Sequence, residues 1–96
     1  MPDFLELQRQ LAPVFDAYGV HSAILFGSFA KGTARETSDV DLLVDSGLRG
    51  LRFVGLIEAV HEALSLPVDL LDVTHIEAGS PIDREIAATG VKIYEK

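Results

Sequence analysis

The sequence contains no cysteine, and only eight of its 96 residues are lysine or arginine, against fifteen aspartates and glutamates. The absence of cysteine excludes disulfides and cysteine-based zinc sites, and it is compatible with a reducing compartment. No apolar run is long enough to span a bilayer, and the N-terminus lacks the charged and then apolar pattern of a secretory leader. We therefore expect a cytoplasmic protein that does not bind a membrane.

Basic residues are also too few and too scattered to form a surface for long nucleic acids. Proteins that hold DNA or RNA usually carry a basic patch that contacts the phosphates. This chain has a formal net charge of −7, and no cluster of lysine and arginine stands out in it. Binding of a long nucleic acid is therefore disfavoured. Binding of a nucleoside triphosphate with magnesium is compatible with the negative charge of the chain, because the metal supplies positive charge.

Hydrophobic residues make up 48% of the chain, which is enough for a packed core. A length of 96 residues is that of one domain, so we expect a single domain over residues 1–96. Apolar periodicity and turn residues predict helices at 3–18, 28–32, 51–64 and 81–89, and strands at 22–27, 39–45, 67–73 and 91–94. This alternation predicts an α+β fold, a two-layer arrangement of helices against a sheet.

The first predicted helix contains a residue that argues against it. Apolar side chains recur at intervals of three and four over residues 3–18, with Asp3 as a cap and Gly19 as a terminator. Pro13 lies inside this span, where a proline costs roughly 3 kcal/mol. The sequence leaves open whether the helix is continuous, kinked or split at this point.

The most informative pattern is Gly27-Ser28, followed after ten residues by Asp39-Val40-Asp41. Residues 22–27 run an apolar strand into a turn of small residues, and Asp39 and Asp41 stand at the start of the next apolar strand. Side chains alternate between the two faces of a strand, so the two carboxylates are expected on the same face. The pattern thus predicts two acids beside a tight turn.

This combination indicates phosphate chemistry. Two carboxylates held close together raise each other's pKa unless a cation neutralises them, and a hard divalent metal with oxygen ligands is the natural cation. The turn at Gly27-Ser28 is expected to leave backbone N–H groups and a hydroxyl free to hold phosphate. Metal-binding acids beside a phosphate turn are the parts that nucleotidyl transfer needs.

The pattern resembles the nucleotidyltransferase superfamily related to DNA polymerase beta, whose signature is Gly-Ser, a spacer of about ten residues, Asp-x-Asp and a third carboxylate on a later strand. The turn at residues 27–32 and the small size are similar to the minimal nucleotidyltransferases (MNT) of bacteria and archaea. These are often the antitoxin of a pair whose toxin is a HEPN-domain ribonuclease. The resemblance covers nearly the whole chain and implies the polymerase beta-like fold, with a small mixed sheet of about four strands.

The resemblance places the third carboxylate on the strand predicted at 67–73. Asp69 lies one residue inside this apolar strand and matches the position of the family's third metal ligand. Asp72 is the rival, although it falls on the opposite face and nearer the strand end. We assign Asp69 as the ligand and interpret Asp72 as a strand-end or turn residue.

The resemblance also implies a role for each motif residue. Asp39, Asp41 and Asp69 would bind two Mg²⁺ ions, or Mn²⁺, and Asp69 would also take the acceptor's proton. ATP or a similar nucleotide would be the substrate.

The turn would hold the triphosphate in this reading. Gly27 would allow close approach, and Ser28 would contact the phosphates. Lys31 and Arg35 are further candidate phosphate contacts, and Lys31 departs from the family pattern because relatives often have arginine there. A lysine meets phosphate as a point charge without the bidentate fork.

Several of these residues also have a plain structural interpretation. Asp39 alone would be read as a strand-start acid, Gly27 as a tight-turn glycine and Ser28 as a helix cap. Lys31 and Arg35 are equally well read as solvated surface charges. Asp41 is harder to explain in this way, because an acid followed by three apolar residues is out of place in a purely structural strand.

Three functions compete at this stage. The leading hypothesis is a nucleotidyltransferase whose acceptor is on another chain, because we expect no second domain here to bind one. The family resemblance implies that it transfers AMP from ATP to a tyrosine of a HEPN-type toxin. The second is a non-catalytic antitoxin that neutralises the toxin by forming a complex. The third is the catalytic subunit of a small-molecule nucleotidyltransferase. The nucleotide, the acceptor and the oligomeric state stay open.

Overall fold

The computed structural model describes residues 4–32 and 39–96, and there the elements lie close to where the sequence predicts them. In chain order they are α1 (Phe4–Ala17), β1 (Ser22–Phe26), α2 (Ser28–Lys31), β2 (Val40–Asp45), α3 (Leu51–Leu64), β3 (Val68–Asp72), the 3-10 turn η1 (Val73–His75), α4 (Pro81–Thr89) and β4 (Val91–Glu95). Every predicted end is met within one residue, and the helices predicted at 51–64 and 81–89 are met at both ends. Among the described residues, no helix has the length and apolar character needed to cross a membrane.

The strands form one mixed sheet in the order β3-β2-β1-β4. β1 pairs antiparallel with β2 and, on its other side, with β4, whereas β2 and β3 are parallel. A parallel pair needs a crossover connection, and α3 provides it. The predicted four-stranded mixed sheet and the antiparallel pairing of the first two strands are both confirmed.

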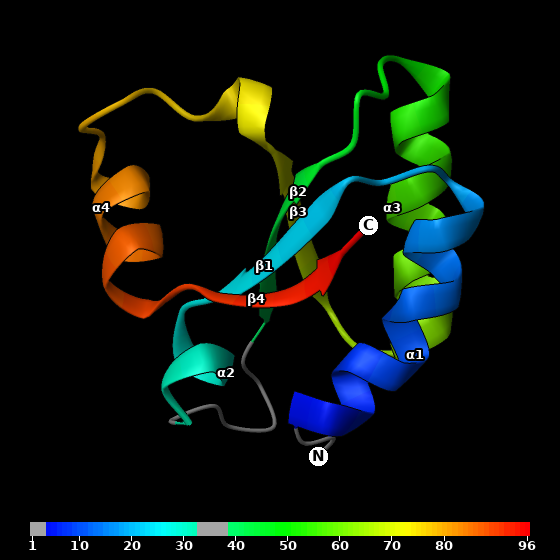
Figure 1. Cartoon of the computed structure of the whole chain (residues 1–96), viewed down its shortest axis with the longest axis horizontal. Helices are drawn as coiled ribbons and strands as arrows, with labels where there is room; N and C mark the ends of the chain where they lie inside the picture. The colour runs from blue at the N-terminus through cyan, green and yellow to red at the C-terminus, as the bar shows by residue number, and fades with distance from the viewer. Residues whose placement is uncertain (1–3, 33–38) are drawn as a thin grey trace.

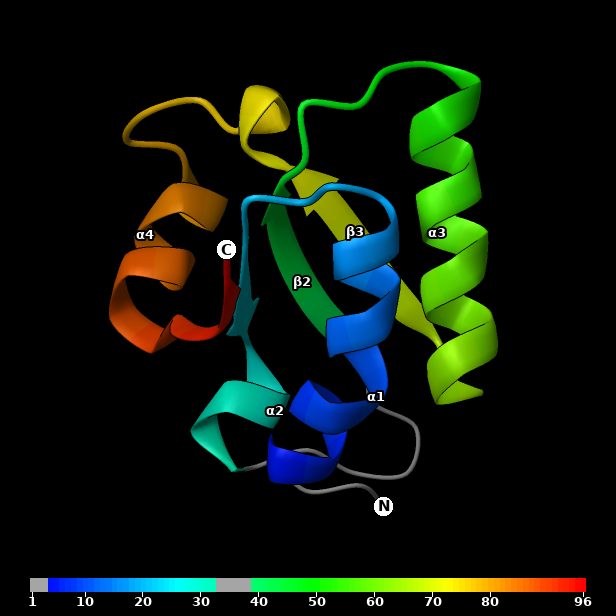
Figure 2. The ribbon, with the colours of Figure 1, turned by 45° about the vertical axis from the view of Figure 1, so that its right-hand side comes forward.

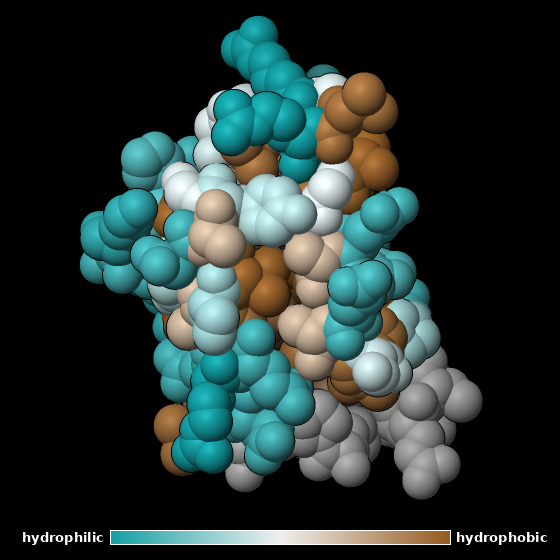
Figure 3. All heavy atoms as spheres, turned by 90° about the vertical axis from the view of Figure 1, so that its right-hand side faces the viewer, coloured by the Kyte–Doolittle hydropathy of each residue, from teal (hydrophilic) through white to brown (hydrophobic). Residues whose placement is uncertain are grey.

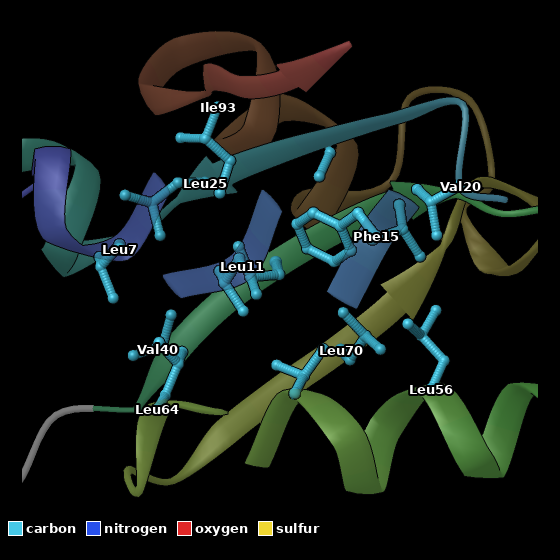
Figure 4. Close-up of a cluster of buried hydrophobic side chains, with 14 residues drawn as sticks. Leu7, Leu11, Phe15, Val20, Leu25, Val40, Leu56, Leu64, Leu70 and Ile93 are labelled. Atoms are coloured by element: carbon cyan, nitrogen blue, oxygen red, sulfur yellow. The ribbon is translucent and has the colours of Figure 1, made fainter. Parts of the chain in front are cut away.

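Helices cover both faces of the sheet. α1 and α3 lie together on one face and α4 lies on the other, as two views of the ribbon show (Figures 1 and 2). The main core lies between the sheet and the α1–α3 layer (Figure 4), and its labelled side chains are Leu7, Leu11, Phe15, Val20, Leu25, Val40, Leu56, Leu64, Leu70 and Ile93. On the outer side of this layer, hydrophilic side chains surround the hydrophobic ones that remain visible (Figure 3).

α1 continues through Pro13 without a break. Leu7, Leu11 and Phe15 follow the helical period and are at most 1% exposed. Burying an apolar side chain of this size stabilises the fold by about 1.5–3 kcal/mol, so three of them outweigh the roughly 3 kcal/mol that an internal proline costs. Tertiary packing therefore decides the question that the sequence left open.

The start of α4 is set by local capping. The Ser80 hydroxyl accepts a hydrogen bond from the Asp83 N–H at 3.2 Å, and Pro81 occupies the first turn, where its missing N–H is not needed. At the other end Gly90 directly follows Thr89, and a Cβ at Gly90 would come within 2.9 Å of Ile24 in β1. The C-terminal end of α4 therefore lies against the central strand.

Candidate functional site

The site begins at Gly27, the first residue after β1. Its backbone angles are φ 75° and ψ −150°, a region that glycine alone occupies readily. A Cβ built on Gly27 would overlap the Asp41 carboxylate oxygen Oδ2 and would lie 3.3 Å from Asp41 Cγ. The absence of a side chain at residue 27 is what makes room for the Asp41 carboxylate.

Asp41 and Asp69 lie side by side on neighbouring strands. The parallel register of β2 and β3 pairs Asp41 directly with Asp69, and residues paired in this way point to the same face of the sheet. That face is opposite to the main core, because the core residues Val40, Leu42 and Leu70 flank the two acids in sequence. The sheet thus brings together two of the predicted acids that are 28 positions apart in the sequence (69 minus 41).

The surroundings of Asp41 disfavour its charge. Burial raises the pKa of this carboxyl, and the charges of Asp69, Glu85 and Asp39 raise it further, to about 6. No hydrogen bond from the described part of the chain reaches the Asp41 carboxylate. A partly buried carboxylate among three other acids fits a divalent cation, whose charge and preference for oxygen ligands would remove the repulsion.

Asp39 lies just before β2 and is exposed. Its charge reaches Asp41, but within residues 4–32 and 39–96 no three acidic or histidine side chains stand close enough together to enclose a metal ion. Of the three predicted carboxylates, the structure therefore pairs Asp41 with Asp69 and places Asp39 just before β2.

Asp72 faces a different environment and is only 3% exposed. Its Oδ1 accepts hydrogen bonds from the Ser46 N–H (3.0 Å) and hydroxyl (2.7 Å), and its Oδ2 accepts from the Thr74 N–H (3.1 Å) and hydroxyl (2.8 Å). Burial alone would raise the pKa of Asp72, but these four donors outweigh it and lower the pKa. Asp72 caps η1, which agrees with its interpretation as a strand-end residue, and its oxygens are already engaged.

The predicted phosphate contacts follow Gly27 along the chain. Ser28 is the first residue of α2, and Lys31 is the last and is exposed. The Lys31 N–H donates to the Gly27 carbonyl at 3.1 Å, which closes the short helix onto the turn. Arg35 lies outside the described residues.

One expectation about this turn is corrected at Gly27. The sequence predicts free backbone N–H groups at Gly27-Ser28, but the Gly27 N–H donates a hydrogen bond to the Thr89 hydroxyl at 3.1 Å. Sequence reasoning missed this contact and also Glu85, whose charge acts on Asp41 more strongly than that of Asp39. Both residues belong to α4, and only the sheet order, which places α4 against β1, brings them to the site.

Comparisons with known proteins find a matching family model and related chains. The family model described as "Polymerase beta, Nucleotidyltransferase" matches residues 9–96. The chain is 38% identical, over 68 residues, to the protein adenylyltransferase MntA of Thermococcus cleftensis, and the match covers 67% of each chain.

Two solved structures share the fold. One is a crystal structure of a toxin–antitoxin complex with AMP-PNP, with a TM-score of 0.74 and 21% identity, covering 93% of this chain and 73% of that chain. The other contains a tri-AMPylated HEPN toxin of Shewanella oneidensis in complex with its MNT antitoxin, with a TM-score of 0.69 and 17% identity, covering 97% and 73%.

Proposed function

Because the chain belongs to the polymerase beta nucleotidyltransferase family, we propose that it transfers AMP from ATP to a hydroxyl group of a partner protein and acts as an antitoxin. The proposed partner is a HEPN-type ribonuclease toxin, and the proposed acceptor is a tyrosine of that toxin. The observation that supports catalysis best is the paired carboxylates of Asp41 and Asp69 beside the Gly27 turn. A protein that acts by binding alone does not need two neighbouring carboxylates that repel each other.

The proposed nucleotide site uses the turn and the acids together. Ser28 at the start of α2 and the Lys31 ammonium are candidates to contact the triphosphate, and Arg35 is a third. Asp39, Asp41 and Asp69 are the residues that would hold Mg²⁺ or Mn²⁺, and two bound ions would stabilise charge on the attacking and leaving oxygens.

The chain's own carboxylates account for the proton in the proposed reaction. The acceptor oxygen forms a bond to the α-phosphorus, and the bond from that phosphorus to the bridging oxygen of the β-phosphate breaks. Pyrophosphate leaves with the electron pair. Asp69, which is exposed and lies beside Asp41, is the proposed acceptor of that proton, and these two observations support the assignment.

The proposal of a protein acceptor rests on the relatives. MntA is named as a protein adenylyltransferase, and an MNT antitoxin of the same fold occurs in complex with an AMPylated HEPN toxin. This chain spans about two thirds of the length of MntA and most of the fold of that antitoxin, which supports the same type of acceptor.

The test is transfer to the protein encoded by the adjacent gene. Incubation of the two proteins with Mg²⁺ and ATP should add about 329 Da, the mass of one AMP residue, to the partner if the two-metal chemistry operates. Intact-mass spectrometry and peptide mapping would identify the modified residue.

Two variants test whether the AMP adduct depends on the Asp41 carboxylate. Asp41→Asn should abolish the adduct, whereas Asp45→Asn, the same change at the far end of the same strand, should not. If no adduct forms and an Asp39→Ala/Asp41→Ala variant still suppresses toxicity, the protein acts as a binding module instead. Transfer to a small molecule without the partner would favour the third function considered above.

A further inference from the structure

The last residue of α4, Thr89, is hydrogen-bonded to the glycine of the phosphate turn, 62 positions away in the sequence. The Thr89 hydroxyl accepts from the Gly27 N–H at 3.1 Å and donates to the Glu85 carbonyl oxygen at 2.8 Å. A hydroxyl carries one proton, and that proton is committed to Glu85, so its lone pair is directed to Gly27. The orientation of this hydroxyl is therefore set by both contacts.

Gly27 depends on such contacts for its conformation. The β1–β2 ladder ends at the pair Phe26 and Asp41, so Gly27 lies beyond the last strand pairing. Its backbone angles are in a region where a glycine without fixed contacts moves freely. Its N–H is held by Thr89 and its carbonyl is held by the Lys31 N–H at 3.1 Å, so α4 and α2 hold the peptide units on the two sides of Gly27.

The position of Gly27 matters for two neighbours. It must keep its Cα against the Asp41 carboxylate, where no side chain fits, and it sets the direction in which Ser28 and α2 leave the sheet. None of the α4 side chains is fully buried, so apolar packing fixes this helix only weakly. A directional hydrogen bond from its last residue then contributes more to the alignment of the turn than it would in a well-packed helix.

We propose that Thr89 is a positioning residue for nucleotide binding, whose hydroxyl holds Gly27 in the conformation that directs Ser28 and α2 toward the triphosphate. The inference rests on the proposed function for the identity of the ligand. Thr89 acts through Gly27, so its loss should weaken binding of ATP and leave the chemical step nearly unchanged.

The decisive comparison is Thr89→Val against Thr89→Ser. Valine keeps the branched shape and removes the hydroxyl, whereas serine keeps the hydroxyl. Thr89→Val should raise the KM for ATP about fivefold, the effect of one hydrogen bond, with kcat within about twofold of the wild type, and Thr89→Ser should restore the wild-type KM. Thr74→Val is the matched control, because it removes a hydroxyl bonded to Asp72 near η1 and should not change the KM for ATP.

Amide hydrogen exchange at Gly27, followed by NMR, tests the contact without any activity. Exchange of the Gly27 N–H should be faster in Thr89→Val than in the wild type and unchanged in Thr89→Ser. An unchanged KM and unchanged exchange in Thr89→Val would overturn the inference, as would an equal rise in KM in Thr74→Val. If the wild type neither binds ATP nor transfers AMP, the proposed function fails, and the Gly27 exchange rates alone then decide whether Thr89 positions the turn.

Discussion

At the end of β1, the Asp41 carboxylate fills the space that a side chain on residue 27 would need. Glycine is therefore required at residue 27 by the contact with Asp41, whether or not phosphate is bound. This contact also joins the two halves of the signature motif, because the turn that is expected to hold the triphosphate is shaped around an acid that is expected to hold the metal.

We predict that Gly27→Ala inactivates the protein more than backbone strain alone explains. The substitution forces a Cβ onto the Asp41 carboxylate and costs about 1–3 kcal/mol for the unusual backbone angles. Gly50→Ala is the control: Gly50 has φ 59° and ψ −133°, and its Cβ would meet nothing within 4 Å. Urea unfolding should show losses of stability in both variants, whereas ATP binding should fall at least tenfold only in Gly27→Ala. Equal ATP affinities in the two variants would contradict the prediction.

Asp41→Asn is predicted to stabilise the metal-free protein at pH 7. The pKa of Asp41 is raised in the fold from an ordinary value of 3.8 to about 6, so its ionisation opposes folding. The contribution of this group to stability is therefore complete below about pH 4 and is lost as the pH rises through 6. A shift of this size corresponds to about 3 kcal/mol, which solvent screening of a partly exposed group reduces to about 1 kcal/mol.

Urea unfolding in EDTA at several pH values measures this effect. The stability advantage of Asp41→Asn over the wild type should be largest at pH 7 and should shrink toward pH 4. Asp45→Asn controls for the loss of a carboxylate from the same strand. An advantage that grows as the pH falls would have the wrong sign for a raised pKa.

Substitution of Asp72 is predicted to lower stability, whereas substitution of Asp69 is predicted to abolish activity. Asp72→Ala leaves four donors on Ser46 and Thr74 without their acceptor, and it should lower the free energy of unfolding by about 3 kcal/mol. Asp69→Asn changes an exposed side chain and should leave the stability nearly unchanged, yet it should abolish AMP transfer. Thermal unfolding and the transfer assay should be performed on both variants. An active Asp69→Asn variant would refute the assignment of Asp69 as the third carboxylate.

Mg²⁺ and ATP together are predicted to stabilise the fold. A ligand present at a hundred times its Kd stabilises by about 2.7 kcal/mol, which raises the Tm of a domain of this size by about 10 °C or more. Differential scanning calorimetry should show this rise with both ligands present and its loss in EDTA or in Asp41→Asn. An equal rise for ATP in EDTA would show that the nucleotide binds without the metal, against the proposed role of the carboxylates.

Much of the fold is predictable because local signals and burial agree. The helix at residues 51–64 follows Gly50, and both its ends follow from the sequence. Its inner face does not, because the apolar residues Leu51 and Val54 share the period of Val60 and Leu64 but are exposed, whereas Leu56 is buried. α1 is different, since the local signal of Pro13 opposes a helix and only the buried face, formed with the rest of the core, overrides it.

The site is predictable only where its residues are close in sequence or share a known spacing. Alternation along a strand places Asp41 on the polar face, and the sheet register then pairs it with Asp69. The contact between Gly27 and Thr89 has no such signal, because it depends on β4 pairing with β1 and thereby holding α4 beside the turn. Long-range sheet order of this kind is set by the whole core and not by any local pattern.

The strand order also determines when the site exists during synthesis. β1 is a central strand, and its two neighbours are β2, made soon after it, and β4, made after all the other elements. The turn that follows β1 is held by α4, which directly precedes β4. A ribosome-bound chain that has not yet extruded residues 81–95 therefore has its acids but not its aligned turn, so nascent chains should be inactive until this segment has left the ribosome.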